Sequence, residues 1–298
     1  MASAPIRLIA IDIDGTLVNG ATGPVSLRNQ QALLEAEAAG ICVAIATGRR
    51  HIYALQVLLA IGLDPDTILI SSNGAMARRF SGELLECASM EMEVARALVP
   101  LLRGLGITVF TFDDEANSDH SHMVTESLDP VHSRIDLWVK ANRDHLTAVK
   151  PLEKALQAEL APGSLLVQGM CAGTIENMIE AERRVRESSV YKRLSMHRTE
   201  YTEWDMAFLD VMPQGISKGV ALKQLAKLLK IPSKQVMAIG DNWNDLEMLE
   251  FAGKAVLMGN AVPEMQALAV ERGWQITTAN DQDGVALAIE SVLAATRE

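Results

Sequence analysis

Short apolar runs alternate with segments of helical character at the start of the chain. Residues 6–12, 41–47 and 67–71 are apolar runs of strand length, and residues 27–39 and 51–59 between them are expected to form helices. This order of strand, helix, strand, helix and strand predicts a parallel sheet with right-handed crossover connections.

The last third of the chain repeats this alternation. The first helix expected there carries Leu222, Leu225 and Leu229 on one face and lysines elsewhere. We expect helices at residues 219–230, 245–251, 264–270 and 284–295, and strands at residues 236–240, 255–258 and 275–277. Both ends of the chain therefore indicate an α/β fold class with a Rossmann-like parallel sheet.

The middle of the chain has a different pattern, in which helical and strand-like runs are mixed. We expect helices at residues 94–103 and 146–159 and strands at residues 107–112, 164–167 and 207–211. A polar stretch at 113–121 and a break at Pro162-Gly163 interrupt these runs.

The strand ends with candidate chemistry all lie outside this middle region. The simplest organisation is a core domain in two segments, residues 1–81 and 213–298. An α/β domain, residues 82–212, would then be inserted between the third and fourth core strands.

The composition indicates a globular protein that lies outside the membrane. Of the 298 residues, 49% are hydrophobic and 22% are charged, and no apolar run is long enough to span a bilayer. Residues 1–5 lack the order of a signal peptide, so the expected compartment is the cytoplasm. Cys42, Cys87 and Cys171 are odd in number and far apart, which favours reduced thiols over a disulfide framework or a zinc site.

The net charge of −11 disfavours nucleic acid as a partner, because phosphate backbones need a basic footprint. It does not exclude a small phosphorylated ligand, which one lysine and a few N–H groups in a pocket can bind. The sequence does not define an oligomeric state.

Two carboxylates, Asp12 and Asp14, follow the first expected strand. An unpaired buried charge is costly, and ligands of open α/β sheets bind just outside the carboxyl ends of the strands. Gly15 allows the chain to turn sharply there. A plain turn is the alternative interpretation, whereas an EF-hand loop is excluded because its glycine would stand two residues later.

Thr47 and Gly48 follow the second expected strand. The Thr47 hydroxyl and nearby N–H groups can hold a phosphoryl oxygen, and Gly48 permits close approach. An N-cap role for Thr47 is the alternative, and the two roles are compatible.

Lys218 lies at the start of an expected helix, directly after Ser217, a plausible N-cap. A cation in the first turn opposes the helix dipole by a few tenths of a kcal/mol to about 1 kcal/mol. Such conflicts with local rules concentrate at functional sites, although a solvated surface lysine is the common alternative.

These strand ends, taken in order, resemble the haloacid dehalogenase (HAD) superfamily of phosphatases. Asp12-Ile-Asp-Gly-Thr16 resembles its first motif, Thr47 its second, Lys218 its third, and Gly240-Asp-Asn-Trp-Asn-Asp245 its fourth. Similarity to the Cof-type branch comes from Ala46-Thr-Gly-Arg49, Ser72-Asn-Gly-Ala75, Ile216-Ser-Lys-Gly219 and Met258-Gly-Asn260. The resemblance implies a HAD core with a large α/β cap domain inserted.

The resemblance also implies roles for the candidate residues. Asp12 is expected to be the nucleophile that forms an aspartyl-phosphate. Asp14 is expected to protonate the leaving alkoxide and then to deprotonate the attacking water. Lys218 is expected to hold the phosphate and offset the charge of Asp12.

A cluster of Asp12, Asp14 and Asp241 would produce strong repulsion between like charges. Mg²⁺, which favours a few carboxylates together with water and substrate phosphate, would resolve it. By resemblance, its ligands are the Asp12 and Asp241 carboxylates and the Asp14 carbonyl. Asp245 would be a further ligand or a support, and it also suits a helix N-terminus.

Other polar residues have weaker claims on the site. Asn73 and Asn244 match family positions that contact phosphate, metal water or the cap, though asparagine also simply forms turns. Arg49 is expected to hold substrate or cap, with a surface ion pair as the alternative. Ordinary packing is favoured for Trp243, and His120 and His122 lack an evident third metal ligand.

The leading hypothesis is a Mg²⁺-dependent phosphatase of a small phosphorylated metabolite, such as a sugar phosphate. A phosphomutase or phosphotransferase would use the same nucleophile, with a hydroxyl in place of water. A phospho-receiver would also phosphorylate an aspartate at a strand end, but such receivers lack an acid/base at the position of Asp14 and an inserted domain.

Overall fold

The computed structural model describes residues 5–18, 23–114, 122–129, 133–157 and 164–297. The chain forms two compact units, which we call the core unit (residues 1–86 and 217–298) and the inserted unit (residues 87–216). The inserted unit therefore begins at residue 87 and ends at residue 216, whereas the sequence predicts residues 82 and 212.

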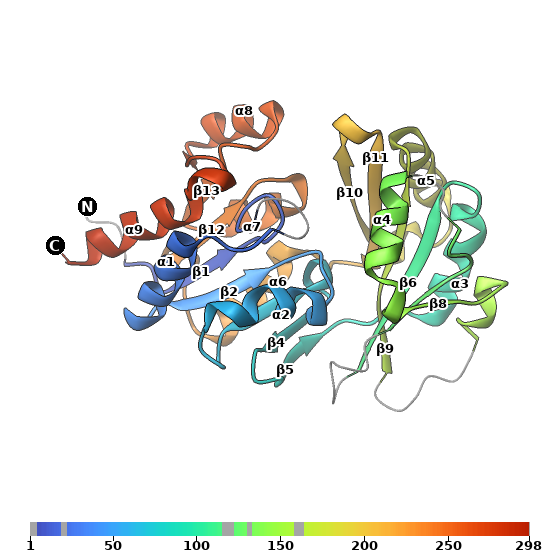
Figure 1. Cartoon of the computed structure of the whole chain (residues 1–298), viewed down its shortest axis with the longest axis horizontal. Helices are drawn as coiled ribbons and strands as arrows, with labels where there is room; N and C mark the ends of the chain where they lie inside the picture. The colour runs from blue at the N-terminus through green and yellow to red at the C-terminus, as the bar shows by residue number, and fades with distance from the viewer. Residues whose placement is uncertain (1–4, 19–22, 115–121, 130–132, 158–163, 298) are drawn as a thin grey trace. The chain divides into compact units, whose positions relative to one another are not determined.

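The core unit is built on one eight-stranded sheet with the strand order β14-β13-β12-β1-β2-β3-β4-β5 (Figure 1). Pairing is parallel from β14 to β3, as the sequence predicts, and β4 runs antiparallel to β3. The strands are β1 (Leu8–Ile11), β2 (Cys42–Ala46), β3 (Ile68–Ser71), β4 (Met76–Arg79), β5 (Leu84–Cys87), β12 (Val236–Gly240), β13 (Lys254–Leu257) and β14 (Gln275–Ile276).

Helices cover both faces of this sheet, which explains why its central strands are continuous apolar runs. Successive β1 side chains point to opposite faces. Ile9 and Ile11 pack with α1, α2 and α9, whereas Leu8 and Ala10 pack with α6, α7 and α8. These helices are α1 (Leu27–Ala38), α2 (His51–Leu58), α6 (Lys218–Leu228), α7 (Leu246–Phe251), α8 (Pro263–Arg272) and α9 (Gly284–Arg297).

The parallel register brings three strand ends to one edge of the sheet. Ile11 in β1 lies between Ile45 in β2 and Ile239 in β12. The residues that follow these strands, Asp12, Thr47 and Asp241, therefore start from neighbouring positions.

Two core strands that the sequence pattern does not reveal, β4 and β5, lie between β3 and the inserted unit. The hairpin β4–β5 extends the core sheet first, and the inserted unit follows β5. The sequence hides β4 because it ends in Arg78 and Arg79, which break the apolar pattern. Arg78 is nevertheless buried, and its guanidinium donates to the Gly82 carbonyl.

The inserted unit has a six-stranded sheet with the order β10-β11-β9-β6-β7-β8. Its pairs are antiparallel except for β7 with β8. The strands are β6 (Ile107–Asp114), β7 (His122–Thr125), β8 (Leu146–Ala148), β9 (Ser164–Gly173), β10 (Leu194–Tyr201) and β11 (Met206–Pro213). The helices are α3 (Met92–Leu102), α4 (Ser133–Ala141) and α5 (Ile175–Glu187), so the expected α/β character is confirmed.

The helix expected at residues 146–159 is wrong. Leu146 starts β8, which pairs with β7, and a short 3-10 helix follows at Leu152–Lys154. Pro151 separates the two, because proline cannot continue a helix from preceding residues. The break at Pro162-Gly163 and most of the polar stretch at 113–121 lie outside the described residues.

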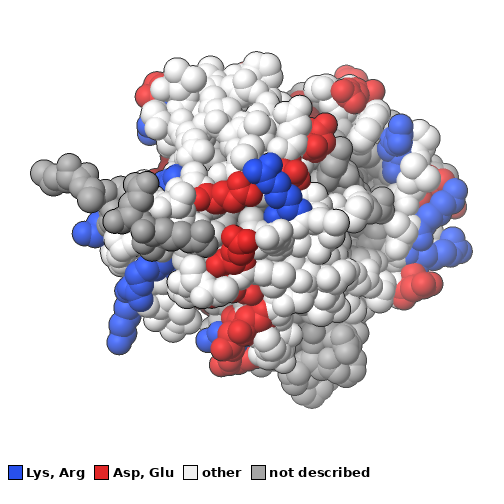
Figure 2. All heavy atoms as spheres, turned by 60° about the vertical axis from the view of Figure 1, so that its left-hand side comes forward, with Lys and Arg blue, Asp and Glu red and all other residues white. Residues whose placement is uncertain are grey.

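No helix of the described residues is long and apolar enough to cross a membrane. On the face drawn in Figure 2, basic side chains form small groups among acidic and uncharged ones.

His51, the first residue of α2, generates a prediction about stability. Its side chain is fully buried, and neither ring nitrogen has a hydrogen-bond partner among the described residues. Burial, and then the charge of Arg78, lower the pKa of His51 to about 4. The unfolded chain, with an ordinary pKa near 6.5, therefore binds the proton more readily than the folded protein between these pH values.

We expect the free energy of unfolding of the wild type to fall, relative to His51→Gln, as the pH falls from 6.5 to 4. The slope of this difference is at most about 1.4 kcal/mol per pH unit, and above pH 7 the difference is flat. Urea titrations of both proteins at a series of pH values measure it. If the difference in unfolding free energy between the two proteins is constant across this pH range, the pKa of His51 is not lowered by folding.

Candidate active site

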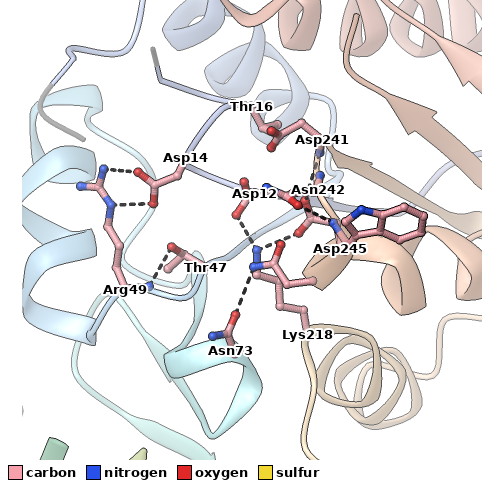
Figure 3. Close-up of polar contacts among 12 residues, drawn as sticks. Asp12, Asp14, Thr16, Thr47, Arg49, Asn73, Lys218, Asp241, Asn242 and Asp245 are labelled. Carbon is pink, nitrogen blue, oxygen red and sulfur yellow. Dashed lines mark hydrogen bonds and ion pairs between the residues drawn. The ribbon is translucent and has the colours of Figure 1, made fainter. Parts of the chain in front are cut away.

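At the carboxyl edge of the core sheet, two aspartates meet one buried lysine (Figure 3). Lys218 Nζ donates to Asp12 Oδ1 at 2.6 Å and to Asp245 Oδ1 at 2.7 Å. The side chain of Lys218 is only 1% exposed, so the alternative of a solvated surface lysine is wrong. The charge from the start of α6 is thus directed at the end of β1.

The Lys218 side chain is directed by a helix start that the sequence predicts. Ser217 is the N-cap of α6, and its hydroxyl accepts a hydrogen bond from the Val220 N–H at 3.1 Å. The Ser217 hydroxyl in turn donates to Glu247 at the start of α7. This cap compensates the local cost of placing a cation in the first turn.

Asp245 links Lys218 to the turn after β12. Its Oδ2 accepts from the backbone N–H groups of Asp241 at 3.0 Å and Asn242 at 3.1 Å. The Asn242 side chain completes a capping box with Asp245. Both Asp245 oxygens are thus engaged, and they tie Lys218 to the turn after β12.

The three carboxylates Asp12, Asp241 and Asp245 carry more negative charge than Lys218 balances. Burial, and then the charge of Asp245, raise the pKa of Asp12 well above its ordinary range, although Lys218 opposes this. The same two causes raise the pKa of Asp241 to about 7. Burial alone lowers the pKa of Lys218, but its two carboxylate partners hold the value above its ordinary one.

The turn after β1 brings Asp241 close to the main chain. Gly15 has a φ of +82°, and a Cβ there would collide with the Asp241 carboxylate. Thr16 Oγ1 donates to Asp241 Oδ1 at 2.9 Å, and the Asn260 amide donates to the Gly15 carbonyl at 2.8 Å. Only glycine fits this backbone conformation and this close approach.

Asp14 points to a different partner from Asp12 (Figure 3). Its two carboxylate oxygens accept from Arg49, at 2.6 Å from Nη2 and 2.9 Å from Nε. The Asp14 side chain is 38% exposed and that of Arg49 is 15% exposed.

Polar residues after β2 and β3 are linked to one another and to the segment after β12 by hydrogen bonds. Thr47 Oγ1 accepts from the Arg49 N–H at 3.1 Å, while Arg50 and not Thr47 occupies the N-cap position of α2. Asn73 Oδ1 accepts from the Asn244 amide at 3.2 Å. A Cβ at Gly48 would lie 3.2 Å from the Asn73 amide, so glycine keeps this contact unstrained.

The donor set fits a hard divalent cation. Asp12, Asp241 and Asp245 each offer a carboxylate oxygen, and these oxygens lie within 4.8 Å of one another. The space that Gly15 leaves for Asp241 and the excess of negative charge both favour such an ion. Oxygen donors of this kind suit Mg²⁺.

A family profile described as haloacid dehalogenase-like hydrolase matches residues 9–289. The chain belongs to the haloacid dehalogenase-like hydrolases.

Known phosphatases match this hydrolase over most of their length. The 5-amino-6-(5-phospho-D-ribitylamino)uracil phosphatase YwtE of Bacillus subtilis is 29% identical over 97% of this chain and 99% of its own. The HMP-PP phosphatase of Cronobacter sakazakii is 30% identical over 88% of this chain and 87% of its own. A haloacid dehalogenase-like hydrolase from B. subtilis has a structure with a TM-score of 0.77 and 26% identity, covering 96% and 99% of the two chains.

The predicted membership of the HAD superfamily, with its Cof-type branch, is therefore confirmed, as is the prediction of a phosphoric monoester hydrolase. The candidate site residues of the core unit follow β1, β2, β3 and β12 or, in the case of Lys218, begin α6. Trp243 is 44% exposed, so it is not packed in the core. His122 stacks on Phe112 in the inserted unit, and His120 lies outside the described residues.

Sequence reasoning missed the contributions of Thr16, Asn242 and Asn260. Thr16 and Asn260 lie inside motifs that the sequence analysis quotes, but their partners are more than 200 residues away. Asn242 had a local signal, since an N-cap asparagine with an acidic residue three positions later predicts a capping box.

Removing the central cation of this HAD site is expected to destabilise the fold. Lys218→Met leaves Asp12 and Asp245 buried without their counter-charge, which costs about 3–5 kcal/mol of unfolding free energy at pH 7. Lys223→Met is the matched control, because Lys223 is exposed on the same helix. Denaturant unfolding in EDTA measures both, and equal stability of the two variants would argue against a buried charge network.

Proposed function

We propose that this hydrolase is a Mg²⁺-dependent phosphatase that hydrolyses a small phosphomonoester through an aspartyl-phosphate. The observation that carries the proposal is the pairing of buried Asp12 with Lys218 at the end of β1. A carboxylate held there by a lysine is a nucleophile with a cation beside it to receive the phosphate. Membership of the family supports the same chemistry.

The reaction would proceed in two displacements. In the first, an Asp12 oxygen bonds to phosphorus, the bond to the leaving oxygen breaks, and Asp14 gives its proton to that oxygen. In the second, Asp14 takes a proton from water as the water oxygen bonds to phosphorus. The bond from Asp12 to phosphorus breaks, phosphate leaves, and Asp14 has regained its proton.

The surrounding residues would bind the phosphoryl group. Lys218 would offset the charge of its oxygens while holding Asp12. Thr47 and Gly48 would approach it from the end of β2, the former with a hydroxyl and the latter with its N–H. Asn73, which follows β3, and Asn244, which follows β12, already contact each other and would contribute amide N–H groups.

The Asp12 and Asp241 carboxylates and the Asp14 carbonyl would hold the metal, with Asp245 supporting them through its backbone contacts. Mg²⁺ supplies charge neutralisation for the phosphate and for the transferring phosphoryl group when it is bound.

The inserted unit is proposed to select the substrate, as a cap domain. The named relatives act on an amino-ribitylamino-uracil phosphate and on HMP-PP, so a small phosphorylated metabolite is the proposed substrate class here. A substrate panel should therefore combine sugar phosphates, nucleotides and phosphorylated pyrimidine derivatives with p-nitrophenyl phosphate.

Asp12→Asn is expected to lower kcat for every substrate that the wild type hydrolyses by more than about 10³-fold, because an amide cannot form the aspartyl-phosphate. Asp144→Asn, at an exposed position of the inserted unit, should leave kcat unchanged. Release of inorganic phosphate measures both. Hydrolysis by Asp12→Asn at the wild-type rate would rule out the aspartyl-phosphate mechanism. Turnover by the wild type only with a bisphosphate activator would indicate a mutase.

Removing a metal ligand should shift the metal requirement. We expect EDTA to abolish turnover and Mg²⁺ to restore it, and Asp241→Asn to raise the Mg²⁺ concentration for half-maximal rate by about 10-fold or more. Rate measurements over a Mg²⁺ titration check this. Full activity in EDTA contradicts the metal requirement. An unchanged half-maximal Mg²⁺ concentration in Asp241→Asn contradicts the assignment of Asp241 as a metal ligand.

A further inference from the structure

The contact between Arg49 and Asp14 has a geometry that constrains what Arg49 does. Two parallel N–H groups of one guanidinium meet the two oxygens of one carboxylate, at 2.6 and 2.9 Å. Such a bidentate pair fixes direction as well as distance, because the guanidinium is planar and its donors form a rigid fork. Asp14 therefore has one orientation set by Arg49.

Arg49 is itself held on both sides of its Cα. Its N–H donates to Thr47 Oγ1 at 3.1 Å, and its carbonyl accepts from the Ser72 N–H at 2.8 Å. The guanidinium is thus projected from a backbone tied to the ends of β2 and β3. A side chain anchored in this way can hold the Asp14 carboxylate, on the turn after β1, in one orientation.

Lys218 and Arg49 contact different aspartates of the site. Lys218 Nζ contacts Asp12 and Asp245, whereas the guanidinium of Arg49 contacts Asp14 (Figure 3). From the sequence we expect Arg49 to hold substrate or the cap. Its Nε and Nη2 are directed instead at the residue assigned as acid/base.

We propose that Arg49 is a positioning residue for Asp14, an inference that rests on the proposed function. The bond from Nε to Oδ2 keeps the carboxyl group oriented, and the bond from Nη2 to Oδ1 opens so that this oxygen can face the leaving group. Arg49 then acts on the leaving-group step through Asp14, without being a ligand of the phosphate.

The dependence on the leaving group separates this role from direct phosphate binding. An alkyl phosphate leaves as a strongly basic alkoxide and needs the proton of Asp14, whereas p-nitrophenolate leaves without help. In Arg49→Met, we expect kcat to fall about 10- to 100-fold more for glycerol phosphate than for p-nitrophenyl phosphate, with KM changing little. Arg49→Lys, which keeps the charge but not the fork, should restore only part of the loss.

A double-mutant cycle provides the second readout. Once Asp14→Asn has removed the acid/base, adding Arg49→Met should cause no further selective loss for the alkyl ester. Arg28→Met is the matched control, because Arg28 forms the same two-bond contact with Glu290 at the surface. Thermal melting of each variant separates a loss of positioning from unfolding. If Arg49→Met does not fold, Arg49→Lys takes its place in the cycle.

Equal losses for both esters with a raised KM, persisting in the Asp14→Asn background, would overturn the inference and make Arg49 a phosphate ligand. That result leaves the phosphatase proposal intact. If the wild type hydrolyses neither ester, nor any member of the substrate panel, with Mg²⁺, the proposed function itself fails.

Discussion

The active-site edge of this protein depends on the ion pairs of one buried lysine. Lys218 lies between Asp12 and Asp245 and reaches both at hydrogen-bond distance. Each of the three groups would be unfavourable at its depth without the others. The end of β1, the start of α6 and the turn after β12 must therefore pack together in one arrangement, and the glycines around them permit that closeness.

The same residues leave an excess of negative charge at the site. One cation cannot neutralise three neighbouring carboxylates. Burial, and then the charge of Asp245, raise the pKa values of Asp12 and Asp241. Phosphate alone would add to this negative charge, whereas a divalent ion bound together with phosphate would offset it. The excess negative charge thus favours a cation, and a bound cation would in turn favour phosphate.

The sequence was most informative where one physical rule dominated. Apolar runs predicted the parallel strands, because both sheet faces are buried, and Lys218 stood out because it conflicts with its own helix. The hairpin β4–β5 escaped notice because Arg78 is buried despite its charge. The helix expected at 146–159 overlooked the local break at Pro151. The contacts of Thr16, Asn260 and Arg49 depend on partners distant in sequence, which local patterns do not reveal.

The division of the core unit into two chain segments has a consequence for synthesis. Strand β1 lies between β2 and β12, and Asp12 is separated from Lys218 by 206 positions. A nascent chain that has not yet reached β12 leaves one side of β1 without hydrogen-bond partners. The inserted unit, whose strands are all contiguous in sequence, can complete its sheet during this interval. Asp12 is therefore synthesised early and Lys218, which pairs with it, late, so their contact forms only after the intervening unit has been made.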